Sequence, residues 1–205
     1  MNRYGARQSE RLLIALLAAA ASAASAQQAD APQIARGDRW RFAVWYTVPT
    51  AEPSREWIVT SIQGETIEAT ENGEPLRLTR NLGVLDSPRD ASSNPRTLDF
   101  PLHLGKRWEY PTDWTFKPKG SRGHSQVAVT VEAYERVRVP AGEFDAFRLS
   151  SSEALSGTSP INSQIAATTR RTYWYAPAAR AIVKIESRNP YLGPSTVELV
   201  AFELR

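Results

Sequence analysis

Residues Gln126–Leu149 read QVAVTVEAYERVRVPAGEFDAFRL, and this stretch decides the fold. Apolar residues recur at alternate positions in its first half, which is typical of a β-strand with one face in the core: Val127, Val129, Val131, Ala133, Val137 and Val139. Glu135 interrupts this apolar face and predicts a β-bulge or a sheet edge at that point. Pro140 and Gly142 are residues that tight turns favour, so the stretch is predicted to fold back on itself as a hairpin.

The same period of two residues recurs along most of the chain. In RWRFAVWYTV, residues 39–48, large apolar side chains alternate with polar ones. The dipeptide Asn72-Gly73 is a strong hairpin signal, because both residues tolerate a positive φ. Beyond the N-terminal segment no stretch shows the 3.6-residue period of a helix, and most connections are short. We therefore predict an all-β fold: an antiparallel meander of about nine to eleven strands, curled as a half-barrel, a barrel or a sandwich.

The first 26 residues have the composition of a secretory signal peptide. Three arginines precede an apolar run of about ten residues, and the small residues that follow fit a cleavage site before Gln27. This run is too short to span a bilayer, so no transmembrane segment is expected after signal cleavage. The protein is predicted to be periplasmic or secreted, through export of the Gram-negative type.

The organisation of the rest of the chain follows from its composition. Residues 27–36 are small and polar and are expected to form a flexible leader, and residues 37–205 a single all-β domain. Residues 86–97, DSPRDASSNPRT, are predicted to be a loop, because they contain two prolines and three serines and no apolar period. The alternative is a front lobe over 37–85 and a back lobe over 98–205, joined by this loop.

Charge and cysteine content exclude several classes of function. The whole chain has 25 basic and 22 acidic residues, but the predicted signal peptide carries three arginines and one glutamate, which leaves 22 and 21. A net charge near +1 gives no support for nucleic-acid binding, which favours a clustered basic face. Cysteine is absent, so disulfides, thiol catalysis and cysteine metal sites are excluded.

The sequence contains no recognisable catalytic or metal-binding motif. Its two histidines, His103 and His124, flank neither a nucleophile elbow nor a metalloprotease helix. Glu143 and Asp145 are too close together beside a turn to act as a glycosidase acid and base, and are expected to face solvent. We expect no catalytic residue, no metal site and no cofactor.

Aromatic residues are the remaining candidates for a binding site. Two clusters fall on predicted strands, one in RWEY and one in YWY, and they supply the predicted ligand-binding residues Trp108, Tyr110, Trp174 and Tyr175. Large aromatic side chains also fill β cores, so a core role for the same residues stays open. The functional alternative is a concave sheet face that binds an apolar or glycan ligand.

Three segments in the back half resemble a known family. FPLHLGKRWEY, VRVPAGEFDAFRL and YWYAPAARAIVKIES follow one another between Phe100 and Ser187, and in this order they resemble exported β-domain proteins labelled TapB-like. Members often have a glycine just before the last Val-Lys pair, where this chain has AARAIVK. The resemblance implies an exported β domain and supplies no catalytic residues.

Three functions are compatible with the sequence. The first is a non-enzymatic exported protein that binds an envelope component on a curved β-sheet: an apolar ligand, a lipid or a partner protein. The second is a hydrolase that cleaves envelope glycans with two carboxylates, which must then face one cleft. The third is an assembly factor recognised through an exposed strand edge, which a closed barrel would disfavour.

Overall fold

The computed structural model describes residues 27–46, 54–160 and 164–205. The predicted signal peptide lies outside these residues. Over the described residues the chain forms fourteen strands and two short 3-10 helices, η1 Lys117–Lys119 and η2 Pro177–Ala179. The strands are β1 Gln28–Ala29, β2 Arg39–Tyr46, β3 Ser54–Gln63, β4 Thr66–Glu71, β5 Glu74–Thr79, β6 Val84–Asp86, β7 Asp90–Ser92, β8 Leu102–His103, β9 Arg107–Phe116, β10 Ser121–Val139, β11 Gly142–Thr158, β12 Ile165–Ala176, β13 Ala181–Asn189 and β14 Gly193–Glu203.

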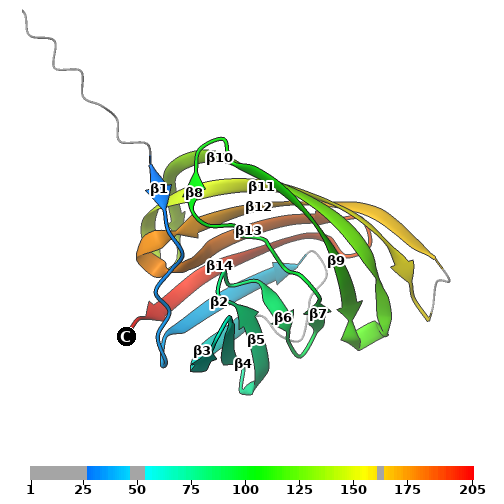
Figure 1. The fold of residues 1–205 in the computed structure, drawn as a ribbon, viewed down its shortest axis with the longest axis horizontal. Helices are drawn as coiled ribbons and strands as arrows, with labels where there is room; N and C mark the ends of the chain where they lie inside the picture. Colours follow the sequence, from blue (N-terminus) through cyan, green and yellow to red (C-terminus); the bar gives the residue numbers. More distant parts are fainter. Residues whose placement is uncertain (1–26, 47–53, 161–163) are drawn as a thin grey trace, which may run out of the picture.

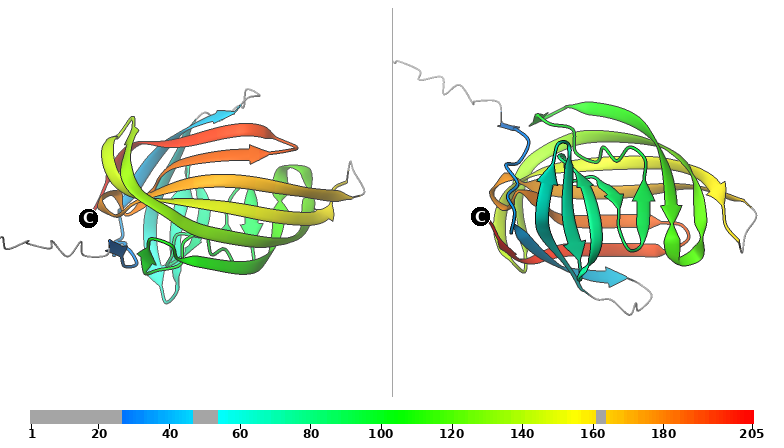
Figure 2. Two further views of the ribbon diagram at one scale, coloured as in Figure 1. Left: turned by 90° about the horizontal axis from the view of Figure 1, so that it is seen from above. Right: turned by 60° about the horizontal axis from the view of Figure 1, so that its bottom comes forward.

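Twelve of these strands form one closed antiparallel barrel (Figures 1 and 2). The order around the barrel is β10-β11-β12-β13-β14-β2-β3-β4-β5-β6-β7-β9, so front and back parts of the chain share one sheet. The predicted all-β antiparallel class is confirmed, with a barrel as the form it takes. Closure leaves the twelve-stranded sheet without a free edge, which disfavours the hypothesis of recognition through a strand edge.

Two opposite ends of the barrel follow from the antiparallel order. We name the end that carries the connections 117–120 and 190–192 the mouth, and the opposite end, which carries the turns 140–141 and 177–180, the core end. Figure 1 shows the mouth on the right and the C-terminus at the core end on the left. No helix in the described residues is long and apolar enough to cross a membrane.

The hairpin of β10 and β11 is the longest ladder of the barrel and contributes to both parts of the core. A bulge falls between Val131 and Ala133, ahead of the predicted interruption at Glu135. Adjacent residues Ala146 and Phe147 are both buried, at 0% and 1% exposure, so both faces of the hairpin are covered near its tip. The predicted bulge is therefore present, but it lies ahead of Glu135. It divides the apolar positions between two core clusters, one that contains Val131 and Leu149 and one that contains Val137 and Phe144.

The tip of this hairpin closes the core end. The N–H of Ala141 donates a hydrogen bond of 3.0 Å to the carbonyl of Leu199 on β14, and Phe144 packs against Phe202 with ring centroids 5.8 Å apart. Figure 2 shows β10 and β11 bending sharply here. Gly142 has a φ of 133°, a backbone conformation that other residues adopt only with strain, so the prediction of a turn glycine here is confirmed. The VPAG turn thus connects β10 to β11 and also packs against β14 at the core end.

Short strands complete the barrel where the sequence predicted a loop. The segment 86–97 contains β7, which pairs with β6 through Asp86 on one side and with β9 on the other. The sequence Asp90–Ser92 has no apolar alternation, so nothing in its side chains predicts a strand; its place in the sheet comes from main-chain pairing alone. The segment is part of the barrel wall and not a linker.

Residues 27–36, expected as a flexible leader, pack against the barrel. β1 pairs with β8, and Ala29 is 6% exposed within a core cluster. Ile34 contacts the second cluster. The segment was expected to be flexible because most of its residues are small or polar, and two isolated apolar residues gave no periodic signal.

A network of charges fixes the segment between β7 and β9, where the closing strands are shortest. The Asp99 carboxylate forms ion pairs with Arg96 at 2.7 Å and with Lys106 at 2.9 Å. Trp108 Nε1 donates a hydrogen bond of 2.7 Å to the carbonyl of Arg96. Partial burial opposes ionisation of Asp99, but the hydrogen bonds and charges of Arg96 and Lys106 outweigh it and lower the pKa of this carboxyl. Leu98, 1% exposed, is held in the core by this network.

Replacing Asp99 with asparagine is expected to lower the free energy of unfolding at pH 7 by about 1–2 kcal/mol, because two charge-assisted hydrogen bonds are weakened. The pKa of the folded state is lowered, so this stabilisation is present above pH ~4 and is lost as the pH falls further. Urea unfolding at pH 7 and pH 3 measures the difference between Asp99→Asn and wild type. A gap that persists unchanged at pH 3 would contradict this account. Asp145→Asn is the control, since its carboxylate is exposed and 3.5 Å from Arg136.

Candidate functional site: the barrel cavity

The interior of the barrel is filled at the core end and left open toward the mouth. Near the core end, cross-strand neighbours on β10, β11 and β12 are bulky: Val131 pairs with Leu149, and Leu149 with Tyr173. Toward the mouth the same wall carries Gly123 opposite Gly157. Because cross-strand neighbours share a face of the sheet, this decrease in side-chain volume leaves space inside the barrel.

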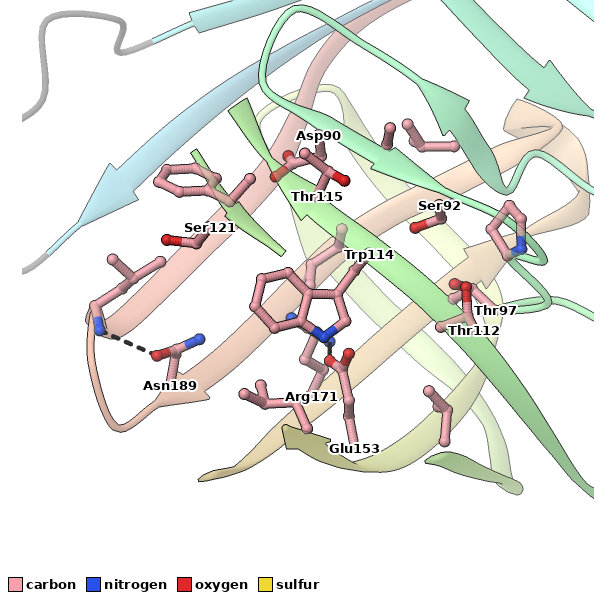
Figure 3. Close-up of a pocket in the computed structure, with 18 of the residues that line it drawn as sticks. Asp90, Ser92, Thr97, Thr112, Trp114, Thr115, Ser121, Glu153, Arg171 and Asn189 are labelled. Atoms are coloured by element: carbon pink, nitrogen blue, oxygen red, sulfur yellow. Dashed lines mark hydrogen bonds and ion pairs between the residues drawn. The ribbon is translucent and has the colours of Figure 1, made fainter. Parts of the chain in front are cut away.

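The resulting cavity has a volume of about 490 Å³, within the range of small-molecule binding sites. Most of its wall is apolar or aromatic. These residues are Trp57, Leu82, Val84, Ala91, Pro95, Tyr110, Trp114, Phe116, Val127, Leu155, Ile165, Tyr173, Ile182, Ile185, Tyr191 and Leu192. Figure 3 shows the polar residues that interrupt this wall.

Trp114 on β9 lies against the glycine pair. A Cβ atom would stand 2.7 Å from its Cζ2 if built at Gly123, and 2.8 Å if built at Gly157. The two glycines therefore make the room that the indole occupies on the inner wall. Its Nε1 is buried and has no hydrogen-bond partner among the described residues.

An ion pair crosses two neighbouring strands inside the cavity. Arg171 Nη1 on β12 donates to Glu153 Oε2 on β11 at 2.5 Å, and Ser125 Oγ on β10 donates to Glu153 Oε1 at 2.8 Å. Burial opposes the charge on Arg171, but Tyr173 and Glu153 outweigh it and raise the pKa of the guanidinium. The positive guanidinium and the negative carboxylate offset each other, so the pair adds no net charge to the cavity.

Tyr110 on β9 is the second polar contact on this side. Burial, with the nearby Tyr173 next in importance, raises the pKa of the Tyr110 hydroxyl to about 12. The hydroxyl stays protonated across the physiological range and can donate a hydrogen bond. It adds a neutral polar group to the cavity wall beside the charged pair of Glu153 and Arg171.

Asp90 on β7 faces the cavity from another strand. Burial among the barrel strands raises the pKa of this carboxyl, with Arg55 and Arg89 opposing the effect, although the side chain reaches solvent through the open cavity. Figure 3 shows Asp90 beside Thr115 and apart from Glu153. The two carboxylates share one cavity but do not converge.

The four aromatic residues predicted to bind ligand lie in different places. Tyr110 lines the cavity. Trp108 and Tyr175 are buried in a core cluster, Tyr175 with its ring centroid 5.2 Å from that of Phe100. Trp174 lies on the outer side of β12, where its Nε1 donates 2.9 Å to Glu135. The structure thus does not bring the four together, and their contact with a ligand stays a prediction.

Glu153 and Arg171 were not among the residues that the sequence analysis singled out. A signal for both exists in the strand period: Glu153 shares its parity with Leu149 and Leu155, and Arg171 shares its parity with Tyr173. A charged residue on an apolar face marks either a bulge or a buried partner. Pairing the two strands in register was needed to show that the two charges meet.

The two histidines do not line this cavity. His103 has an exposed ring, and His124 Nδ1 lies 2.8 Å from Asp113 Oδ1 on the exposed surface. Among the residues that the structure describes, no three His, Asp or Glu side chains cluster so as to hold a metal ion. The barrel interior, with its polar groups inside an apolar wall, is the candidate site.

Comparison with solved structures finds similar folds at low sequence identity. A candidate lipoprotein from Parabacteroides distasonis ATCC 8503 matches with a TM-score of 0.57 and 14% identity, over 85% of this chain and 99% of that chain. A candidate exported protein with a YmcC-like fold from Bacteroides fragilis NCTC 9343 has a TM-score of 0.49 and 13% identity, over 85% and 99%. The hypothetical lipoprotein YmcC from Escherichia coli K12 has a TM-score of 0.48 and 10% identity, over 81% and 84%.

These comparisons establish a fold and nothing finer. The likeness to the Parabacteroides protein shows that the two chains share a fold. Comparison with protein-family models finds no match, and comparison with curated proteins finds none. The class that the fold and the cavity define is a closed antiparallel barrel with an open interior.

Glu153→Gln is expected to destabilise the protein by about 2–3 kcal/mol, because it leaves the charge of Arg171 unpaired inside the barrel. The double variant Glu153→Gln with Arg171→Met should recover at least half of that loss, since no uncompensated charge remains. Thermal unfolding of the two variants measures the effect. Glu143→Gln, in an exposed pair with Arg138, is the control and should leave the melting curve unchanged. Equal losses in the single and double variants would contradict the ion-pair account.

Proposed function

We propose that this protein is a non-enzymatic exported protein that binds one apolar or amphipathic molecule of the cell envelope inside its barrel. The observation that carries the proposal is the cavity of about 490 Å³ behind an apolar and aromatic wall. A barrel with a solid interior would have no place for a ligand. Here the core end is packed and the mouth half is open.

The wall chemistry indicates the kind of ligand. Trp57, Ile182 and Ile185 offer apolar surface on one part of the wall, which favours a hydrocarbon chain or ring. The Glu153–Arg171 pair is neutral as a unit and presents both donors and acceptors. A neutral or zwitterionic group that can hydrogen-bond matches this pair, and Tyr110 adds a donor of the same kind.

Binding is favoured over hydrolysis of envelope glycans. The hydrolase hypothesis needs two carboxylates free to act on one bond. Of the two that line the cavity, Glu153 is engaged by Arg171 and Ser125, and Asp90 lies apart from it. A single unengaged carboxylate leaves the acid and base roles without a pair.

The exported location is also part of the proposal. The N-terminal arginines, apolar run and small residues before Gln27 support export to the periplasm or beyond. The names of the structural neighbours, a lipoprotein and an exported protein, are consistent with it. We also propose membership of the TapB-like family, on the three segments between Phe100 and Ser187.

Filling the cavity tests the binding function. Leu155 lines the cavity and Ala154 is its exposed neighbour on the same strand, so Leu155→Trp and Ala154→Trp add the same side chain inside and outside the barrel. N-phenyl-1-naphthylamine, an apolar probe that fluoresces when bound, is titrated into each folded variant. Leu155→Trp is expected to weaken binding by about tenfold or more, a clash of at least 1.4 kcal/mol.

Ala154→Trp is expected to bind the probe as wild type does. Circular dichroism establishes that both variants are folded. Equal affinity in Leu155→Trp and wild type, or no binding by wild type, would refute the proposal.

A further inference from the structure

We propose that the mouth of the barrel docks on the surface of an anionic lipid bilayer through the hairpin tip between β13 and β14. This inference goes beyond the proposed function, because docking can occur with the cavity blocked. Its basis is a set of exposed apolar side chains at one end of the barrel, together with two arginines that pair with no acidic side chain of the described residues.

The tip presents two large apolar side chains to solvent. Tyr191 is 54% exposed and Leu192 is 45% exposed, and both also line the cavity at its mouth. Exposed apolar side chains of this size, adjacent in a turn, are typical of an interaction surface. Trp45, 49% exposed, stands on the outer face of β2 near the end of that strand.

The tip is held in one conformation by its own hydrogen bonds. Asn189 Oδ1 accepts from the N–H of Tyr191 at 2.8 Å and of Leu192 at 3.1 Å. The hydroxyl of Tyr191 donates to the carbonyl of Ala166 on β12 at 3.0 Å. The exposure of the two apolar side chains is thus built into the turn, and these side chains need little further ordering on docking.

Two arginines stand directly opposite each other beside this tip. Arg170 on β12 pairs in register with Arg188 on β13, and both are exposed. Like charges at opposed positions destabilise a sheet unless an anion lies between them. The two side chains border a hollow of about 350 Å³ on the outer face of the barrel.

Within the described residues no acidic side chain pairs with either arginine. Glu186, two residues before Arg188 on β13, is already 2.8 Å from Lys184. Lys119 in the neighbouring connection is exposed at the cavity mouth and adds a further positive charge. The positive charges at this end are complementary to lipid phosphates.

The combination of Tyr, Leu and Arg side chains at the mouth indicates a lipid bilayer as the partner. Tyr191 is suited to the headgroup region, Leu192 to the first carbons of the acyl chains, and Arg170 with Arg188 to the phosphates. A polyanion in solution would use the arginines and leave the apolar pair exposed. A bilayer surface satisfies both, and it places the cavity mouth against the lipids.

Vesicle sedimentation of the mature chain tests the proposal. Wild type is expected to bind vesicles of phosphatidylcholine mixed with phosphatidylglycerol, to bind pure phosphatidylcholine more weakly, and to lose binding as salt is raised. Arg170→Ser with Arg188→Ser should weaken binding about fivefold for each arginine. Leu192→Ser should weaken it by about fivefold to tenfold.

Matched controls at the core end make the test specific. Arg36→Ser with Arg107→Ser removes the same charge from two exposed arginines, and Leu104→Ser removes a leucine that is 50% exposed. Arg36 and Leu104 precede β2 and β9, and Arg107 is the first residue of β9, so all three positions lie at the core end. These variants should bind anionic vesicles nearly as wild type does. Circular dichroism verifies that each variant is folded.

Two results would overturn docking: no binding of wild type to anionic vesicles, or equal losses in the mouth and core-end variants. The cavity-filling variant Leu155→Trp separates this proposal from the proposed function. If it loses the apolar probe and keeps vesicle binding, the two activities are distinct. If it folds but loses vesicle binding as well, docking through the rim alone is wrong.

Discussion

The structure depends on one packing constraint: the inner wall of the barrel loses side-chain volume from the core end to the mouth. Protein interiors pack as densely as organic crystals, so the bulky row Val131–Leu149–Tyr173 narrows the interior, and Tyr173 forms part of the cavity wall. Near the mouth the Gly123–Gly157 pair adds no side chain to the interior, and the indole of Trp114 takes up part of the width that it leaves. The hairpin tip at Ala141 packs against β14 at the core end, where its N–H donates to the carbonyl of Leu199.

The sequence predicted the class of fold because the strand period is a local property. Val127 to Val131 and the VPAG turn follow directly from alternation and turn chemistry. The closing strands β6 and β7 were missed, because three-residue strands are held by main-chain bonds to distant segments. The bulge before Ala133 shifted which residues face which cluster, and one misplaced residue reverses every side chain after it.

The site was less predictable than the fold, because it is assembled from several strands. Tyr110, Trp108 and Tyr175 belong to one buried cluster, and of the three only Tyr110 also lines the cavity. Alternation along a strand cannot distinguish an aromatic residue of the core from one of the cavity wall. Glu153 and Arg171 are 18 residues apart in the chain, and their side chains meet between the neighbouring strands β11 and β12. Neither residue indicates a site without the other. Register decides such pairs, and register depends on the whole barrel.

The cavity wall and the exposed tip of the β13–β14 hairpin form one continuous surface, since Tyr191 and Leu192 belong to both. The central claim is that the interior of the barrel holds a ligand. Native mass spectrometry of the protein isolated from its own exported compartment tests this most directly. The account predicts a mass excess of one small apolar or amphipathic molecule per chain, absent in Leu155→Trp. Wild type with the mass of the bare chain alone, even after incubation with extracted envelope lipids, would contradict it.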